Sequence, residues 1–312
     1  MVNDQSAWRV QPQGAVFSEW TAPDGMQLRR MDWPVKGRTK RRGSLLIANG
    51  RSDFIEKYLE VYADFHARGW NVTTFDWRGQ GGSRGPGEER LDNSFDPFIE
   101  DLTALLAEWH ETTPGPHVAM GHSMGGHLLL RTIVDSRPAL DAAILTAPML
   151  NVNSAPIPVR IAPDIADTMY WLGFGKMPMW KVPPAMIAPG GRRNRNLTHS
   201  PERYADELYW WAARPDFNTG APSFGWMRAA FSSRAATFTP EKLRRIGLPI
   251  LIIAAEKDRL VSADAIREAA ALLPHAELEM MPDAAHEILR DSDEIRARAY
   301  AWIDVFLARL KG

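Results

Sequence analysis

The sequence predicts an α/β fold, in which helices cover both faces of a mostly parallel sheet and one helical insertion interrupts the alternation. Three observations support this prediction. Short apolar runs that suit buried strands alternate with stretches of helical spacing. The alternation stops over residues 151–240 and then resumes. With 312 residues, 45% of them hydrophobic, the chain can bury one large core.

The first part of the chain opens with a hairpin and continues with strands and helices in turn. Two β-prone runs, over 15–20 and 26–33, are joined by a segment containing Asp24-Gly25, a favoured hairpin turn. Later apolar runs predict strands over 44–50, 70–77, 117–121 and 142–150. Helical spacing predicts helices over 54–69, 95–111 and 124–136, with a glycine-rich loop over 78–87. Such alternation is typical of a parallel sheet covered on both faces.

Residues 151–240 break this pattern. They contain proline-rich loops and no convincing strand, whereas strands are predicted again over 248–258 and 276–281. Helices are expected near 262–273 and 291–310. We therefore expect residues 1–150 and 241–312 to form the α/β core, and residues 151–240 to form a helical cap inserted into it.

The composition excludes several classes of function. The formal net charge is −1, from 37 basic and 38 acidic residues, so no nucleic-acid partner is indicated. The absence of cysteine excludes a thiol nucleophile, a disulfide framework and cysteine-ligated zinc. We see no secretory signal and no apolar window long enough for a transmembrane helix, so a cytoplasmic location is expected. The sequence makes no prediction of oligomeric state.

The segment AMGHSMGG, residues 119–126, lies between a predicted strand and a predicted helix. A sharp strand-to-helix turn holds its central serine clear of the sheet and needs small neighbours two residues away. Gly121 and Gly125 flank Ser123 at that spacing. Ser123 is therefore the candidate nucleophile. The Met124 N–H, at the start of the helix, is a candidate donor to a developing oxyanion.

A serine needs a base, and in this strand–turn–helix context the chain order should be serine, acid, histidine. His127 lies on the helix that follows Ser123 and cannot reach over its own turn. His275 precedes a strand, and His199 falls in the insertion. His286 follows the last predicted strand and precedes the last helix, so it is the candidate base.

The orienting acid should follow the strand before that histidine. Asp258 lies at the end of the run over 248–258 and is the favoured candidate. Glu256 and Asp283 are the alternatives, and Asp258 could also be a solvated loop acid paired with Arg259.

A second oxyanion donor is expected from the loop after the third strand. Here that loop is ANGRSDF, and it nominates the backbone N–H of Arg51. The Arg51 side chain is a separate question, since it could reach an anionic substrate group or form a surface ion pair with Asp53.

The chain resembles the α/β-hydrolase superfamily, and within it the group of lysophospholipase L2 and monoacylglycerol lipase. The motifs that carry the resemblance span most of the chain: NGRSDFIEKY, GWNVTTFDWRGQGGSRG, GHSMGG, LTAPML, LTHSPERY, GAPSFGWMRAA and AAHEIL. DWRGQGGS and GHSMGG are typical of the wider superfamily. LTHSPERY and GAPSFGW lie in the insertion and are similar to lysophospholipase L2 in particular.

This resemblance implies Ser123 as nucleophile, His286 as base and Asp258 as acid, with the amides of Arg51 and Met124 as oxyanion donors. It also implies that residues 151–240 cover the active site. The chain departs from many lipases of the group in one place, because it has Asn49-Gly50 where they have His-Gly.

The expected cap is rich in methionine and aromatic side chains, which suit a groove for acyl chains or the packing of the cap itself. The candidate substrate-binding residues are Met169, Trp171, Phe174, Met177 and Trp180. An exposed face of this kind would also suit contact with a membrane surface. Arg192, Arg193 and Arg195 cluster nearby and could pair with a phosphate or form a solvated loop.

We expect a serine hydrolase of small lipid or ester substrates, most simply a lysophospholipase or monoacylglycerol lipase, which needs no cofactor and no metal. The alternatives are a short-chain carboxylesterase or lactonase with the same triad, a peptidase or C–C hydrolase of the same superfamily, and a non-catalytic binding protein of this fold.

Overall fold

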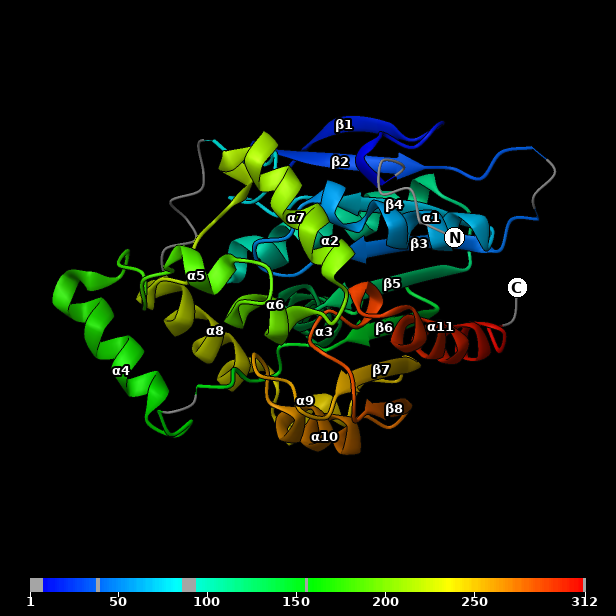
Figure 1. The fold of residues 1–312 in the computed structure, drawn as a ribbon. Coiled ribbons are helices and arrows are strands. Elements are labelled where there is room, and N and C mark those ends of the chain that lie inside the picture. The colour runs from blue at the N-terminus through cyan, green and yellow to red at the C-terminus, as the bar shows by residue number, and fades with distance from the viewer. Residues whose placement is uncertain (1–7, 38–39, 86–93, 155–156, 311–312) are drawn as a thin grey trace.

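The computed structural model describes residues 8–37, 40–85, 94–154 and 157–310. Its centre is an eight-stranded sheet in the order β1-β2-β4-β3-β5-β6-β7-β8 (Figure 1). The hairpin of β1 (Val16–Thr21) and β2 (Gln27–Trp33) is antiparallel, and β2 pairs antiparallel with β4 (Trp70–Phe75). The remaining strands are parallel: β3 (Gly43–Ala48), β5 (His117–His122), β6 (Ala142–Thr146), β7 (Ile250–Ala255) and β8 (Ala276–Met281).

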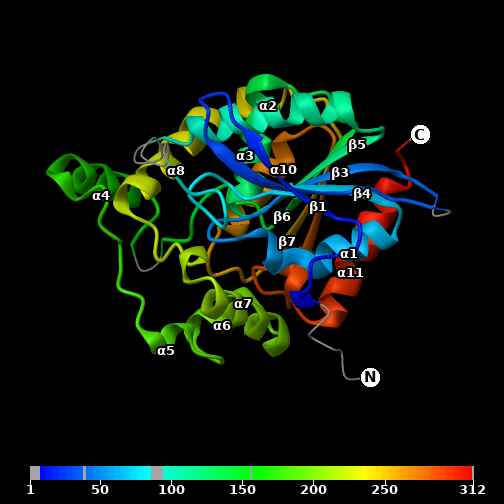
Figure 2. The ribbon, with the colours of Figure 1, turned by 90° about the horizontal axis from the view of Figure 1, so that it is seen from above.

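Helices cover both faces of this sheet, as Figure 2 shows from above. On one face lie α2 (Asp96–Thr112), α3 (Met124–Ser136) and α10 (Ala263–Leu272), which share an apolar core with one side of the strands. On the other lie α1 (Leu59–Ala67) and α11 (Asp293–Leu307), with a second apolar core. The predicted α/β architecture, a mostly parallel sheet covered on both faces, is therefore confirmed.

The strands that were predicted from short apolar runs are buried throughout their length in β3, β4, β5, β6 and β7. Their bounds differ from the predicted ones mainly at the carboxyl ends. The runs over 142–150 and 248–258 were predicted too long, because their last residues leave the sheet at Thr146 and Ala255 and form loops. Those loops lie at the carboxyl edge of the sheet, where parallel strands place functional side chains.

Between β6 and β7 the described residues form helices and no strand of the sheet. These are α4 (Ala162–Met169), the π-helix η4 (Tyr170–Phe174), α5 (Pro184–Ile187), α6 (Arg192–Leu197), α7 (Pro201–Ala213), η5 (Pro215–Phe217), α8 (Phe224–Thr237) and α9 (Pro240–Leu243). We call α4 to α8 the cap segment. Its first part, α4 with η4, projects away from the sheet (Figure 1).

The glycines around Ser123 are required by close backbone contacts. A Cβ on Gly125 would overlap the carbonyl oxygens of Ala48 and Asn49, and a Cβ on Gly121 would lie 2.6 Å from the Gly125 oxygen. Real Cβ atoms do not approach other atoms so closely, so α3 can pack this tightly against β3 and β5 only with glycine at both positions. The G-x-S-x-G spacing thus brings the start of α3 against the end of β3.

Candidate active site

Ser123 lies at the turn between β5 and α3 in a backbone conformation that few residues adopt. Its φ is 52° and its ψ is −116°, in a region that is strained for residues with a side chain. Strain of this kind is typical of a nucleophile elbow, which holds the hydroxyl above the carboxyl edge of the sheet. The Ser123 N–H donates to the Thr146 carbonyl at 3.0 Å, and this bond fixes the turn to the end of β6.

The structure brings the three predicted side chains together at this edge. His286 Nε2 lies 2.9 Å from Ser123 Oγ, and His286 Nδ1 lies 2.7 Å from Asp258 Oδ2. Asp258 follows β7 and His286 follows β8, so each reaches the serine from a loop at the carboxyl end of its strand. Both side chains are buried. This geometry is the one that a nucleophile, a base and an orienting acid require.

Asp258 and His286 determine each other's protonation. Burial opposes the charge of Asp258, but the imidazole and the N–H groups of Leu260 and Val261 hold the pKa of its carboxyl below the ordinary value. Burial would likewise lower the pKa of His286, yet the Asp258 carboxylate raises it above the ordinary value of a histidine. At neutral pH the histidine can carry its proton on Nδ1 and accept the serine proton at Nε2.

The alternative acids are engaged elsewhere. Glu256 forms an ion pair with Arg267, and Asp283 forms one with Arg298 on the surface. Only Asp258, of the three carboxylates weighed on the sequence, contacts His286 in the described structure. It does not act as a solvated loop acid, because its side chain is 1% exposed.

The alternative histidines also lie away from the serine hydroxyl. His127 is buried on α3, where its ring contacts the Met149 carbonyl and the Ser233 hydroxyl, each at 2.8 Å. His199 contacts the Asp291 carboxylate. The carbonyl of His275 accepts the N–H at the start of β7, which places that residue at the opposite edge of the sheet.

The loop over residues 49–53 is held by side-chain hydrogen bonds from both sides. The Gly50 N–H donates to Asp53 Oδ2 at 2.7 Å, and the Ser52 N–H donates to Gln80 Oε1 at 3.0 Å. Gln80 Nε2 donates in turn to the Gly50 carbonyl at 3.1 Å. The motif DWRGQGGS, residues 76–83, therefore supports this loop through its glutamine.

The amide of Arg51, in this loop, is free of hydrogen bonds to the part of the chain that the structure describes. Among the described residues, no hydrogen-bond acceptor is found for the N–H of Arg51 or for the N–H of Met124. The loop lies against the nucleophile, since a Cβ on Gly50 would be 3.2 Å from Ser123 Cβ. Free amides in the residue after the serine and in a loop packed against it are what an oxyanion hole requires.

Comparisons with known proteins agree with this geometry. A family model described as "Serine aminopeptidase, S33" matches residues 39–293, which is most of the chain. The chain belongs to this family of serine hydrolases. It is therefore an enzyme of the α/β-hydrolase fold, and the predicted resemblance is confirmed.

Several curated relatives are lysophospholipases or monoacylglycerol lipases. The chain is 29% identical over 288 residues to "Lysophospholipase L2" of Escherichia coli, covering 84% of this chain and 79% of that protein. It is 25% identical over 261 residues to "Monoacylglycerol lipase" of Mycolicibacterium smegmatis, covering 82% and 85%. The fold is similar to that of a soluble variant of monoglyceride lipase from Saccharomyces cerevisiae, with a TM-score of 0.77, 18% identity, and 97% and 98% of the two chains covered.

A buried ammonium group in this hydrolase joins the loops on both sides of the serine. Lys57 Nζ lies 2.6 Å from Asp53 Oδ1, 2.6 Å from Glu287 Oε1 and 2.9 Å from Glu207 Oε1. Asp53 belongs to the loop that carries the Arg51 amide, and Glu287 follows His286 directly. Glu207 comes from α7 of the cap segment. One lysine therefore contacts three parts of the chain that surround the site.

Two guanidinium groups complete the balance of charge in this network. Arg193 binds both oxygens of Glu207, at 2.7 and 2.8 Å, and Arg290 Nη1 lies 2.5 Å from Glu287 Oε2. Burial alone would lower the pKa of Lys57, but the surrounding carboxylates raise it above the ordinary value. The three carboxylates lie close enough together to resemble a cation site, and the ammonium of Lys57 bonds to each of them.

No pattern in the sequence indicates this network. Asp53 and Lys57 are four residues apart, and that spacing could have suggested a pair. Glu287 and Glu207 are charged residues of ordinary appearance, in a helix or beside a histidine, and no local pattern indicates that they meet. The expected alternative for Arg51 is also corrected, because Asp53 is buried against Lys57 and does not form a surface ion pair with Arg51.

The cap segment also contacts the histidine loop through its backbone. The N–H of His286 donates to the Asn196 carbonyl at 3.2 Å, and the N–H of Glu287 donates to the Leu197 carbonyl at 2.8 Å. The end of α6 is thus paired directly with the residue that contacts Ser123. Positioning of His286 depends on this half of the cap segment as well as on the sheet.

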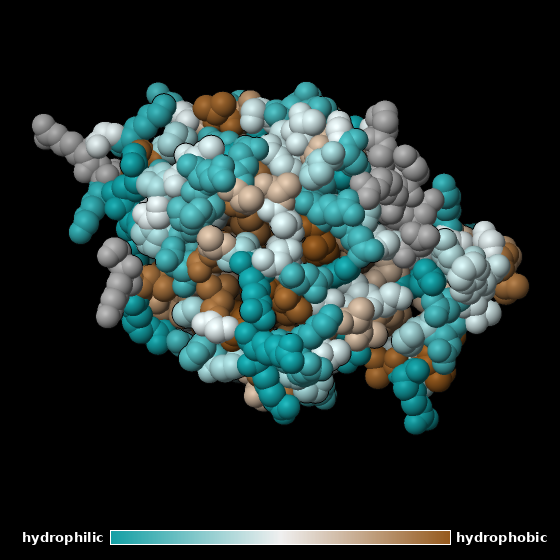
Figure 3. Space-filling view, turned by 180° about the vertical axis from the view of Figure 1, so that it is seen from behind, coloured by the Kyte–Doolittle hydropathy of each residue, from teal (hydrophilic) through white to brown (hydrophobic). Residues whose placement is uncertain are grey.

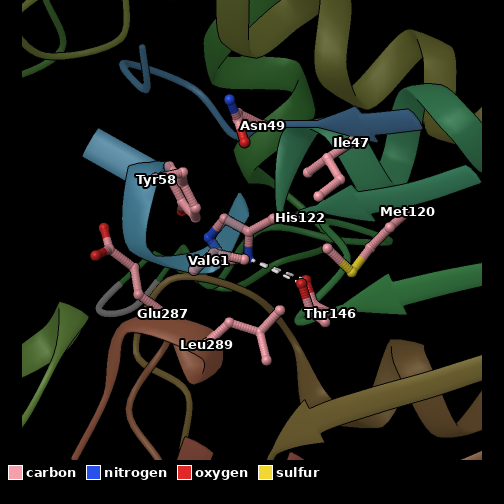
Figure 4. Close-up of a pocket in the computed structure, with 9 residues that line it drawn as sticks. All are labelled: Ile47, Asn49, Tyr58, Val61, Met120, His122, Thr146, Glu287 and Leu289. Atoms are coloured by element: carbon pink, nitrogen blue, oxygen red, sulfur yellow. Dashed lines mark hydrogen bonds between the residues drawn. The ribbon is translucent and has the colours of Figure 1, made fainter. Parts of the chain in front are cut away.

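A small cavity lies close to the site, and Figure 4 shows the residues that line it. Its volume is about 10 Å³, and its polar lining includes Asn49, Tyr58, His122, Thr146 and Glu287. Burial and the nearby charge of His286 lower the pKa of His122 to about 4, so this ring is neutral at physiological pH. The cavity holds no more than one water-sized group. A substrate must therefore approach Ser123 from elsewhere.

The predicted substrate-binding residues of the cap lie on its projecting part or just after it. Trp171 is 74% exposed, and Phe174, Met177 and Trp180 are exposed as well, while Met169 is half-buried. None of the five lines the small cavity or a second, open groove of about 500 Å³ beside Asp258. That groove lies between residues 151–159 and 256–267. The acyl-binding role of the five residues stays a prediction.

The charge coupling between Asp258 and His286 predicts a pH profile. The base must be neutral, and its pKa is raised, so kcat/KM should fall on acidification through a value above 6.5. Asp258→Asn removes the charge that raises this pKa, so the acidic limb should move to lower pH while kcat falls about 10⁴-fold. The measurement is kcat/KM from pH 4 to 9 with a p-nitrophenyl ester. A limb that stays in place in Asp258→Asn would contradict the assignment.

The Lys57 network predicts a large loss of stability when the lysine is removed. Lys57→Met leaves three buried carboxylates with too little positive charge, so the free energy of unfolding should fall by about 3–5 kcal/mol. Urea unfolding followed by circular dichroism measures it. Lys242→Met, the same change at an exposed lysine, is the control and should cost less than about 0.5 kcal/mol. Equal losses of unfolding free energy in the two variants would show that the network does not stabilise the fold more than an exposed lysine does.

Proposed function

We propose that this hydrolase cleaves carboxylic esters of the acyl-glycerol type, lysophospholipids or monoacylglycerols, through a Ser123–His286–Asp258 triad. The observation that carries the proposal is the position of His286 between Ser123 Oγ and Asp258 Oδ2, within hydrogen-bond distance of both. The names of the curated relatives, lysophospholipase L2 and monoacylglycerol lipase, support the choice of substrate class.

The mechanism follows from the geometry of these groups. His286 Nε2 takes the proton of Ser123, and Ser123 Oγ attacks the ester carbonyl carbon. The N–H groups of Arg51 and Met124 stabilise the oxyanion of the tetrahedral intermediate. His286 then gives its proton to the departing glycerol oxygen, which leaves an acyl group on Ser123. Water, deprotonated by the same imidazole, attacks this acyl group, and the fatty acid is released.

A peptidase is the second candidate, because the family model bears the name of an aminopeptidase. An aminopeptidase needs a carboxylate near the nucleophile to bind the α-ammonium group of its substrate. The carboxylates close to the serine already have partners. Asp258 is bonded to His286, and Asp53 and Glu287 are paired with Lys57, so none of them is free to bind an ammonium group. The described residues around Ser123 therefore favour an ester over a peptide.

A short-chain esterase or lactonase with the same triad remains the closest alternative. A panel of p-nitrophenyl esters from C2 to C16, with lysophosphatidylcholine and monoolein, distinguishes these functions. We expect turnover of long chains and of at least one of the two lipids. A rate maximum at C2–C4 with neither lipid hydrolysed would overturn the acyl-glycerol proposal. Ser123→Ala should lower kcat about 10⁶-fold and abolish labelling by a fluorophosphonate.

We further propose that the projecting part of the cap segment contacts a lipid surface. None of the helices in the described part of the chain combines the length and the apolar character that a bilayer crossing requires. Instead, Trp171 and Leu172 are 74% and 64% exposed, and the basic residues Arg160 and Lys181, before and after them in the chain, are exposed as well. Figure 3 shows hydrophobic side chains at this end of the molecule. Exposed apolar groups flanked by basic ones suit an interfacial contact.

Vesicle sedimentation tests this contact. With vesicles of phosphatidylcholine and phosphatidylglycerol, the double change Trp171→Ser and Leu172→Ser should lower the partition coefficient at least tenfold, because two large apolar groups no longer enter the interface. Val305→Ser, an exposed apolar residue on α11, is the control. Unchanged sedimentation together with lost turnover of C12–C16 esters would assign these residues to acyl binding and not to the membrane.

A further inference from the structure

The Arg51 side chain carries a charge that nothing in the described structure neutralises. Its Nη1 donates to the Gly220 carbonyl at 2.9 Å and to Ser52 Oγ at 3.1 Å, and its guanidinium carbon lies 5.3 Å from the centre of the Trp226 ring. These partners are neutral. Among the described residues no carboxylate lies within ion-pair distance of Arg51.

Other enclosed arginines near the site are each paired with acids. Arg193 binds Glu207, Arg290 binds Glu287, and Arg78 binds two aspartates. Taking a guanidinium out of water is costly unless an anion compensates for it, so an enclosed arginine without an acid is a candidate anion receptor. Arg51 itself is half-buried, so its guanidinium is partly withdrawn from water and partly exposed.

The surroundings of Arg51 increase its affinity for an anion. Burial and the positive charge of Arg193 lower its pKa to about 10, so it remains protonated at neutral pH but is poorly compensated. An anionic ligand would relieve this unfavourable environment. A guanidinium group also offers a fork of N–H donors that matches the oxygens of a phosphate.

The position of Arg51 places its positive charge near the ester bond that would be cleaved. Its backbone N–H is one of the two free amides beside Ser123, so the oxyanion and the guanidinium are held by the same residue. In an acyl-glycerol phosphate, the chain of bonds from the ester carbonyl to the phosphorus is about as long as an extended arginine side chain. A phosphate at the far end of the glycerol can therefore reach the guanidinium while the carbonyl lies in the oxyanion hole.

We infer that the Arg51 guanidinium, packed between Gly220 and Trp226 of the cap segment, binds the phosphate of the substrate head group and makes the enzyme prefer lysophospholipids to monoacylglycerols. This inference rests on the proposed acyl-glycerol function and refines its substrate class. It gives the side chain a role in specificity that is distinct from the role of the backbone amide.

The test compares two substrates that share acyl chain and ester but differ in the phosphate. The quantity is kcat/KM for a lysophosphatidylcholine divided by kcat/KM for the matching monoacylglycerol, both presented in the same detergent micelles. This ratio cancels any effect of the substitution on the oxyanion loop that is common to both esters. Arg51→Met should lower the ratio about tenfold or more, the size expected for a lost hydrogen bond to a charged group. Arg51→Lys, which keeps the charge but not the fork, should lower it less.

A matched control comes from the same part of the cap segment. Arg228 lies on α8, as Trp226 does, but is already paired with Asp167 at 2.9 Å. Arg228→Met should leave the ratio near that of the unchanged enzyme. A ratio that is unaltered in Arg51→Met, or that falls equally in Arg228→Met, would overturn the assignment.

A second measurement separates this inference from the proposed function itself. sn-Glycerol 3-phosphate should inhibit hydrolysis of p-nitrophenyl butyrate competitively, and Arg51→Met should raise its inhibition constant about tenfold. If the enzyme hydrolyses neither lipid, the acyl-glycerol proposal fails, yet this inhibition still reports a phosphate site at Arg51. Absence of inhibition in the unchanged enzyme would overturn the phosphate site whatever the lipid results are.

Discussion

The ammonium group of Lys57 is the interaction on which the arrangement of the site depends most. It lies between the loop that carries the Arg51 amide, the loop that carries His286, and helix α7 of the cap segment, and it binds one carboxylate from each. The sheet places Ser123 and Asp258 at its edge, but it does not by itself relate these loops to one another. A buried ion network can do so, because displacing any one carboxylate leaves the lysine under-compensated in a poorly solvating environment.

This network divides the cap segment into two parts with different energetics. The helices α6 and α7 are bonded to the core through Arg193, Glu207 and the backbone of Asn196 and Leu197. The projecting part, α4 with η4, packs chiefly on α8 and exposes large apolar side chains. Opening α6 and α7 would pull on the histidine loop, whereas moving α4 and η4 would leave the triad intact. Substrate access is therefore better suited to the α4 side.

The sequence predicted those site residues whose positions follow from local structure, that is, from a turn or from the end of a strand. Ser123 could be found because the turn between a strand and a helix needs glycine on both sides, and Asp258 and His286 because each follows a strand of a parallel sheet. The Lys57 network could not be found, because its members are far apart along the chain and each resembles a solvated surface charge. Met169, Trp171 and their neighbours suited either a groove or a cap core, and composition alone does not distinguish these from an exposed arm.

Charge is compensated unequally among the groups around Ser123, and this inequality affects which ligands the site can bind. The carboxylates of Asp53, two residues from Arg51, and of Glu287, next to His286, are paired with Lys57 and Arg290, so neither is free to bind a cationic substrate. Arg51, in contrast, has only neutral partners among the residues that the structure describes. A site with its acids neutralised and one cation uncompensated attracts anions and disfavours ammonium groups. The pairing of Asp53 and Glu287 with Lys57 and Arg290 also affects His286. Unpaired carboxylates beside this histidine would raise its pKa further, and less of it would be neutral at physiological pH.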